Sequence, residues 1–223
     1  GHAATISGVA FNSDGSQAAT CAADNSVQLW NTSTGEVLQS FVGHTAAVVG
    51  IAITSSNAEV ITASADKTVR VWTAADGKIA RTITAPAAIS RMAVSRDGTR
   101  IAVAQTDRIV QIYKAADGAL VHTLAGHQEA VSMLTFSGDG TRLMSADANR
   151  AIVRDSASGR VLEIFPVAQG IPAAVFGATA AEVILARSDT GINLHSLKFK
   201  IALGEMAKAI TGIACAADGS VYT

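Results

Sequence analysis

The chain has 223 residues, of which 49% are hydrophobic and 16% are charged, a composition typical of a folded globular protein. Its formal net charge of −1 provides no positive field that would attract nucleic acid or an anionic membrane. No apolar run reaches the length of about 18 residues that a membrane-spanning helix needs. The two cysteines are far apart in sequence and are interpreted as small apolar side chains. We therefore expect a soluble protein; the compartment stays open, with the cytoplasm slightly favoured over export.

A unit of 41 or 42 residues recurs along the chain. Gly-His pairs occur at Gly1, Gly43 and Gly126, and Ala85-Pro86 occupies the place where a further pair would fall. Asp-Gly pairs recur with the same period, at Asp14-Gly15, Asp97-Gly98, Asp139-Gly140 and Asp218-Gly219. In the second unit Ser56-Asn57 takes the place of this pair. Such pairs tolerate a positive φ and make tight hairpins between strands. A fixed period of this length indicates a repeat architecture.

Each unit contains apolar runs of four to seven residues that are rich in Val and Ile and bounded by Gly, Asp, Asn and Ser. This is the composition of β-strands, and no window supplies a convincing helical period. Runs such as 48–53 and 101–104 are apolar on both faces, which suits sheets that lie between other sheets. Four short strands per unit predict an all-β protein built as a β-propeller.

The predicted organisation is a single domain, 1–223, with five four-stranded blades and the start of a sixth. The expected blades cover about 1–42, 43–84, 85–125, 126–166 and 167–206, and the sixth begins at 207–223. The chain starts at Gly1, inside a unit, and so we expect it to be part of a longer polypeptide. An arc of five blades and a fraction would leave apolar faces uncovered. We therefore expect another protein, or a further segment of the same one, to complete a larger ring.

The recurring set of Gly-His, then Ser-x-Asp, then a Trp near the end of the third strand resembles the WD-repeat family of β-propellers. The resemblance extends over essentially the whole chain. It implies a rigid disc, typically of seven blades, that binds peptides or domains on its faces and rim and has no catalysis of its own.

The resemblance also implies a buried tetrad of His, Ser or Thr, Asp and Trp in each well-kept unit. In the second unit the expected members are His44, Ser64, Asp66 and Trp72. A neutral imidazole between a carboxylate and a hydroxyl gives each buried donor an acceptor.

The other units keep only parts of this set. The first has His2, Asp24 and Trp30 but Ala22 at the place expected for the hydroxyl. The third has Pro86, Asp107 and Tyr113 at the corresponding places. The fourth has His127 and Ser145, either Asp147 or Asn149 at the turn, and Arg154 at the place of Trp.

One aspartate recurs at the turn before the third strand of each unit; these residues are Asp24, Asp66, Asp107, Asp147 and Asp189. Since each stands at the same turn, they are interpreted as hydrogen-bond acceptors of a structural turn and not as acid–base groups. The histidines are spread over the units, which argues against a metal site. No phosphate loop, nucleophile elbow or haem motif is present. The sequence therefore predicts no catalytic residue, cofactor, metal or small-molecule ligand.

Arg91 is the one candidate contact for an anion. It stands on the expected innermost strand, where the other units have Gly8, Gly50 and Met133. A guanidinium facing a central channel could hold a carboxylate or phosphate. The alternative is a solvated side chain, or an ion pair with Asp97 and Asp107.

Two functions follow as hypotheses. The first is a non-enzymatic scaffold for protein–protein interaction within a larger protein or assembly; the Ala-rich, Lys-poor composition favours a bacterial source. The alternative is an accessory propeller domain of an enzyme or redox protein whose catalytic segment lies outside this chain.

Overall fold

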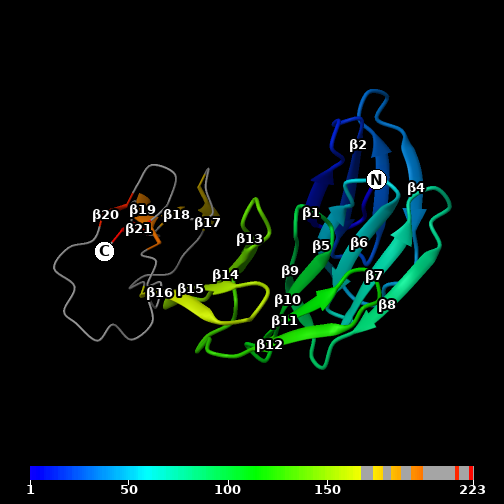
Figure 1. The fold of residues 1–223 in the computed structure, drawn as a ribbon. Helices are drawn as coiled ribbons and strands as arrows, with labels where there is room; N and C mark the ends of the chain where they lie inside the picture. Colours follow the sequence, from blue (N-terminus) through cyan, green and yellow to red (C-terminus); the bar gives the residue numbers. More distant parts are fainter. Residues whose placement is uncertain (167–172, 178–181, 187–191, 198–213, 216–220, 223) are drawn as a thin grey trace.

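The computed structural model describes residues 1–166, 173–177, 182–186, 192–197, 214–215 and 221–222. This part of the chain consists of β-strands and short turns (Figure 1). It contains no helix, and so none that is long and apolar enough to cross a membrane. The all-β prediction is confirmed for these residues.

Four sheets of four antiparallel strands follow one another in chain order, and within each sheet every strand pairs with the next. Sheet 1 consists of β1 (Ile6–Phe11), β2 (Gln17–Ala22), β3 (Val27–Asn31) and β4 (Val37–Phe41). Sheet 2 consists of β5 (Val48–Ile53), β6 (Glu59–Ser64), β7 (Thr68–Thr73) and β8 (Ile79–Thr84).

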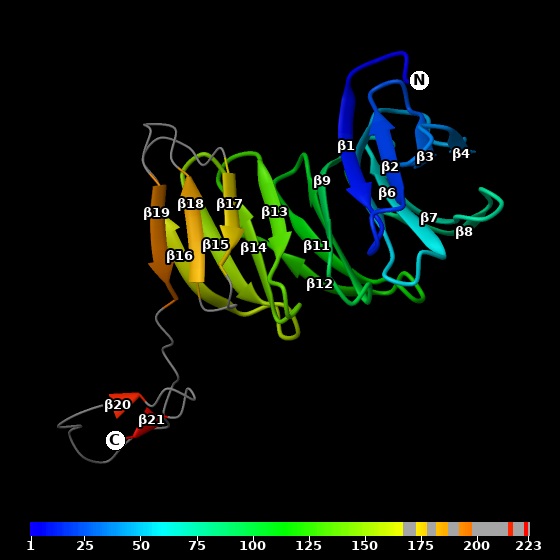
Figure 2. The same cartoon turned by 90° about the horizontal axis from the view of Figure 1, so that it is seen from above.

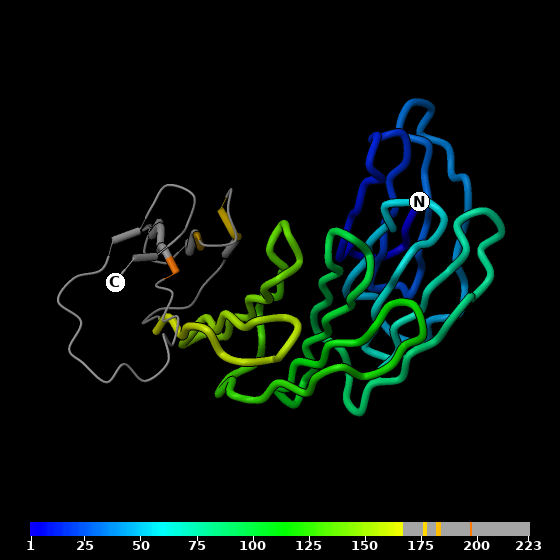
Figure 3. Tube along the Cα trace, in the orientation of Figure 1, coloured from blue at the N-terminus to red at the C-terminus, as the bar shows by residue number. Residues whose placement is uncertain are grey.

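The next two sheets repeat this order. Sheet 3 consists of β9 (Ile89–Val94), β10 (Arg100–Gln105), β11 (Val110–Lys114) and β12 (Leu120–Leu124). Sheet 4 consists of β13 (Met133–Phe136), β14 (Arg142–Ala146), β15 (Arg150–Asp155) and β16 (Val161–Pro166). The Cα trace in Figure 3 shows the same up-and-down path in each sheet.

The C-terminal strands are described only in part. Sheet 5 consists of β17 (Ala173–Phe176), β18 (Glu182–Ala186) and β19 (Ile192–Ser196). The fourth strand expected near 198–202 lies outside the described residues. β20 (Ala214–Cys215) and β21 (Val221–Tyr222) pair in antiparallel fashion within the range predicted for the sixth unit.

Sheets 1 to 5 stand side by side along an arc, with sheets 1 and 5 at its two ends (Figure 2). The first strands of successive sheets are neighbours in the order β1, β5, β9, β13 and β17. These strands therefore line the inner side of the arc. The sheets are consistent with propeller blades, while the total number of blades and the closure of a ring stay predictions.

Hydrophobic cores fill the spaces between adjacent sheets. Between sheets 1 and 2 the cluster includes Leu29, Phe41 and Trp72, and a separate cluster joins sheets 2 and 3. All four residues of the run Ile101–Ala104 in β10 are fully buried. The prediction that this run is apolar on both faces because sheets cover it from both sides is confirmed.

The hairpins between the first and second strands use the predicted turn residues. Gly15 and Gly98 both adopt φ of 72°, and Asn57 takes the same left-handed conformation at φ of 60°. Glycine adopts this conformation without strain, and asparagine tolerates it better than most residues. These turns reverse the chain between the first and second strands of sheets 1, 2 and 3.

Candidate functional site

A chain of buried hydrogen bonds connects three parts of sheet 2. His44 precedes β5; its Nδ1 lies 2.8 Å from Asp66 Oδ2 and its Nε2 lies 2.8 Å from Thr62 Oγ1. The Trp72 indole N–H donates to the same Thr62 oxygen at 2.8 Å. Every donor is satisfied if Trp72 donates to Thr62, Thr62 donates to Nε2, and Nδ1–H donates to Asp66.

The hydroxyl in this chain is Thr62, so the assignment of Ser64 is wrong. Ser64 donates to Ala46 O at 2.8 Å and accepts the Asp66 N–H at 3.1 Å, which holds the turn before β7. Residues 62 and 64 lie on the same face of β6 because side chains alternate along a strand. The imidazole of His44 and the indole of Trp72 both contact the Thr62 hydroxyl, two residues before Ser64 along β6.

The electrostatics of the site keep His44 neutral and Asp66 ionised. Burial lowers the pKa of His44, and the hydrogen bond to Asp66 only partly opposes this effect. Burial alone would raise the pKa of Asp66, but hydrogen bonds from Thr68, His44 and Thr45 lower it to about 2. This is the protonation state that the hydrogen-bond chain requires.

Sheet 1 has the same hydrogen-bond chain, except that the Ser26 hydroxyl lies between His2 and Asp24. His2 Nε2 lies 2.6 Å from Thr20 Oγ1, and the Trp30 indole donates to Thr20 at 2.7 Å. His2 Nδ1 lies 2.6 Å from Ser26 Oγ, which in turn donates to Asp24 at 2.5 Å. The sequence interpretation, which placed Ala22 at the hydroxyl position, missed Thr20 by the same two residues.

Sheet 4 builds the connection with arginine in place of tryptophan. His127 lies 2.9 Å from Asp147 Oδ2 and 2.7 Å from Ser145 Oγ, which decides the turn position in favour of Asp147 over Asn149. Arg154 is 2% exposed and donates to Ser145 at 3.2 Å and to Ala125 O at 2.6 Å. The guanidinium thus supplies the donor that the indole supplies in sheets 1 and 2.

Sheet 3 has a different polar chain, built on the side-chain amides of Gln105 and Gln111 and on Tyr113. Gln105 accepts the N–H of Ala87 at 3.0 Å and donates to Gln111 at 2.9 Å. The Tyr113 hydroxyl donates to the same Gln111 oxygen at 2.5 Å. A polar chain therefore crosses sheet 3 although its unit has Pro86 at the histidine position.

A sequence signal for the correct hydroxyl exists. It stands 18 residues after the histidine of the Gly-His pair in sheets 1, 2 and 4: His2 to Thr20, His44 to Thr62 and His127 to Ser145. Counting from the histidine would have found Thr20 and Thr62, whereas counting back from the aspartate does not.

The recurring turn aspartates accept backbone N–H groups. Asp107 accepts the Ile109 N–H at 3.1 Å, and Asp66 accepts that of Thr68 at 2.9 Å. Asp24 and Asp147 accept the N–H groups of Ser26 and Asn149. Asp189 lies outside the described residues. Where described, these carboxylates close the loop before the third strand.

Arg91 bridges two sheets on the inner side of the arc. Its Nε donates to Ser132 O at 2.8 Å and its Nη1 donates to Ser90 O at 2.7 Å, and the residue is exposed. Asp97 instead accepts the hydroxyl of Ser95 in its own turn at 2.5 Å. Contact of Arg91 with an anion stays a prediction.

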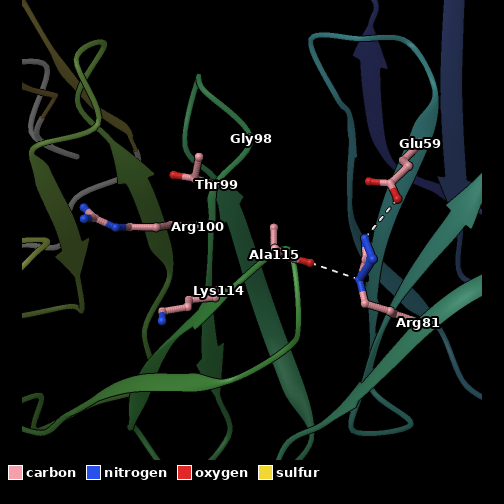
Figure 4. Close-up of a pocket in the computed structure, with 8 residues that line it drawn as sticks. Glu59, Arg81, Gly98, Thr99, Arg100, Lys114 and Ala115 are labelled. Atoms are coloured by element: carbon pink, nitrogen blue, oxygen red, sulfur yellow. Dashed lines mark hydrogen bonds and ion pairs between the residues drawn. The ribbon is translucent and has the colours of Figure 1, made fainter.

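A cavity of about 500 Å³ lies between sheets 2 and 3 (Figure 4). Arg81 crosses it, donating to Glu59 at 2.9 Å and to Ala115 O at 3.1 Å. Arg100 points away from this pair, as Figure 4 shows, and donates to Ser156 at 2.5 Å. These two cations join neighbouring sheets and do not converge on a common ligand position.

Within the described residues no group of three or more His, Cys, Asp or Glu side chains is placed to hold a metal ion.

The family whose model matches the chain is described as WD domain, G-beta repeat (WD40). The matched residues are 1–31, 35–73 and 118–153. These segments include the three His-hydroxyl pairs described above. No curated protein matches the chain.

Proposed function

Because the chain belongs to the WD-repeat family, we propose that it is a non-enzymatic scaffold whose exposed sheet face is covered by a further blade-like sheet. WD40 repeats generally mediate protein–protein interaction, and the domains that they form are typically not catalytic.

The observation that carries the proposal is the exposure of one face of β1. Val9 is 59% exposed and Phe11 is 63% exposed. Val9 pairs with Thr20, the hydroxyl of the buried chain, as Leu134 pairs with Ser145 in sheet 4. Val9 and Leu134 are therefore equivalent positions, as are Phe11 and Phe136.

At these positions the later sheets are covered by the sheet before them. Ile51 and Ile53 pack against the core between sheets 1 and 2, and Leu134 and Phe136 are each only 9% exposed. Ile6, at the start of β1, adds a third exposed apolar side chain at 55%. Apolar faces of this kind in soluble proteins mark interaction sites.

We expect the covering partner to be a β-sheet, because the same side-chain pattern is covered by a sheet at every later position. It comes either from another segment of the same polypeptide or from another protein. Burial of Val9 and Phe11 stabilises the contact by about 1.5–3 kcal/mol for each side chain.

A photo-crosslinking amino acid at position 9 of the native polypeptide tests this proposal. The expected product joins position 9 to a strand of a blade-like sheet, and mass spectrometry identifies whether that strand is intramolecular. The matched control carries the crosslinker at position 42, since Val42 is 86% exposed and lies outside the strands. If position 9 gives no more product than position 42, the proposal is wrong. It is also wrong if the 223-residue chain is a stable, monodisperse monomer with a closed ring of five blades.

A further inference from the structure

A second cavity, of about 520 Å³, opens where the first strands of sheets 1, 2 and 3 end. It is distinct from the cavity of Figure 4, although the turn at Gly98 borders both. Its size lies within the range of ligand pockets. The side chains around it come from equivalent positions of three consecutive repeats.

The apolar part of this cavity is formed by the last residues of three strands. These residues are Phe11 of β1, Ile53 of β5 and Val94 of β9. Ile53 and Val94 are partly buried and pack against the cores between sheets. The repeat thus places three apolar side chains together on the inner side of the arc.

The polar part comes from the residues two positions further along each turn: Ser13, Ser55 and Arg96. All three are exposed, and none of their side chains makes a hydrogen bond or ion pair with any residue in the described part of the chain. In sheet 4 the equivalent position is Gly138, so this set of polar groups ends at sheet 3.

Neighbouring polar groups in the same turns are already engaged. Ser95 donates to Asp97, and the Asp97 carboxylate also accepts from Thr99, at 2.5 and 2.9 Å. Thr54 lies 3.2 Å from Ser56 Oγ. The guanidinium of Arg96 and two hydroxyls are therefore the donors at this cavity that stay available for a ligand.

We propose that this cavity binds the C-terminal residue of a partner polypeptide. The terminal carboxylate pairs with Arg96, which offers a planar, bidentate donor set, and accepts from the Ser13 and Ser55 hydroxyls. An apolar side chain on the last residue packs on Ile53 and Val94. A single guanidinium balances the single charge of a carboxylate, and the adjoining apolar surface suits a side chain that a free phosphate lacks.

The inference rests on the proposed role as a protein scaffold and adds the chemistry of one partner. It uses the side chains of Ile53, Val94 and Arg96 from sheets 2 and 3 and none from β1, so it does not depend on which sheet covers β1. Failure of this site would leave the covered face of β1 unaffected, and the crosslink at position 9 reports on that face separately.

Fluorescence anisotropy tests the proposal with a short labelled peptide that ends in leucine with a free carboxylate. The comparison peptide is its C-terminal amide, which lacks the charge and requires no change to the protein. The protein variants are Arg96→Gln and, as the matched control, Arg160→Gln. Arg160 is also exposed but lies in the turn before β16, outside the cavity.

We expect the carboxylate peptide to bind the wild type and the Arg160→Gln variant equally. Amidation of the peptide, or the Arg96→Gln substitution, should each weaken binding by about 10-fold or more, as expected for the loss of a charged hydrogen bond. Absence of binding, or equal binding of the amide, or equal binding by Arg96→Gln, would overturn the proposal. Displacement of the peptide by an equal concentration of inorganic phosphate would also overturn it, since the site would then be a phosphate site.

Discussion

In sheet 2 the Trp72 indole donates to Thr62 at 2.8 Å, and in sheet 4 the Arg154 guanidinium donates to Ser145 at 3.2 Å. The histidine ends of the two chains are nearly identical, with Nδ1 lying 2.8 and 2.9 Å from the aspartate oxygen. The connection between the strands therefore requires a donor at this position of the third strand and does not require an indole.

The two donors differ in what else they contribute. Trp72 packs against Phe41 with ring centroids 5.7 Å apart, and it meets the edge of His44 at 5.9 Å. Arg154 fills its site with a charged group, and burial lowers its pKa. The described residues place no carboxylate within ion-pair distance of Arg154, which is satisfied by a hydroxyl and a carbonyl. Sheet 2 is therefore stabilised by apolar packing of the indole, whereas burying the guanidinium in sheet 4 has a desolvation cost.

The largest expected effect is that of Trp72→Ala. Removing this fully buried side chain should lower the free energy of unfolding by about 3–5 kcal/mol, because it leaves a cavity and deprives Thr62 of its donor. Arg154→Ala should cost less, since the variant also removes a buried charge. Urea denaturation of the two variants measures the difference. An Arg154→Ala variant that is destabilised as much as Trp72→Ala would contradict the packing argument.

A smaller loss should follow from removing only the shared hydroxyl. Thr62→Val keeps the shape of the side chain and leaves the indole N–H and His44 Nε2 without a partner, at a cost of about 1–3 kcal/mol. Thr62→Ser, which matches the residue in sheet 4, is the control and should retain most of the stability. Equal unfolding midpoints for the two variants would show that the hydroxyl is not the link.

Lowering the pH should destabilise sheet 2 and sheet 4 over the same pH range. Burial lowers the pKa of His44 and of His127 below the ordinary value of 6.5. Below that pH the unfolded chain takes up protons that the folded chain excludes, so stability falls as the pH decreases from about 6.5. Asp66, with its pKa lowered to about 2, adds a further loss as the pH falls below about 3.8.

The measurement is the free energy of unfolding at pH 7, 6, 5 and 4, compared with that of a variant carrying His44→Gln and His127→Gln. The variant should have a flatter profile between pH 7 and 5, although it is less stable at pH 7. A wild-type stability that does not change over this interval would show that the two imidazoles are not held neutral by burial.

The smallest effect in this series is expected for Ser64→Ala. Its hydroxyl holds a turn through two backbone groups, and losing it should cost about 0.5–1.5 kcal/mol. Hydrogen exchange should show the change at the Asp66 amide, which loses its acceptor, and not at the Trp72 indole. If Ser64→Ala were more damaging than Thr62→Val, the assignment of Thr62 as the shared hydroxyl would be wrong.

The sequence by itself determined the features that depend on short-range chemistry. Short runs rich in Val and Ile predict strands, and Asp-Gly and Asn residues predict the turns between them, because both depend on neighbouring residues. The period of the Gly-His pairs sets the step from sheet to sheet. The offsets of His44, Asp66 and Trp72 likewise predict a group, and hydrogen bonds connect these three residues through Thr62.

Only the tertiary structure decided which groups meet. Ser64 and Thr62 share one face of one strand, and the depth at which the imidazole enters the sheet determines which of them it reaches. Arg154 takes the role of an indole because its flexible side chain can bring an N–H to the same oxygen. Ser13, Ser55 and Arg96 are about 41 residues apart in sequence and border one cavity, because the repeat stacks equivalent turns side by side.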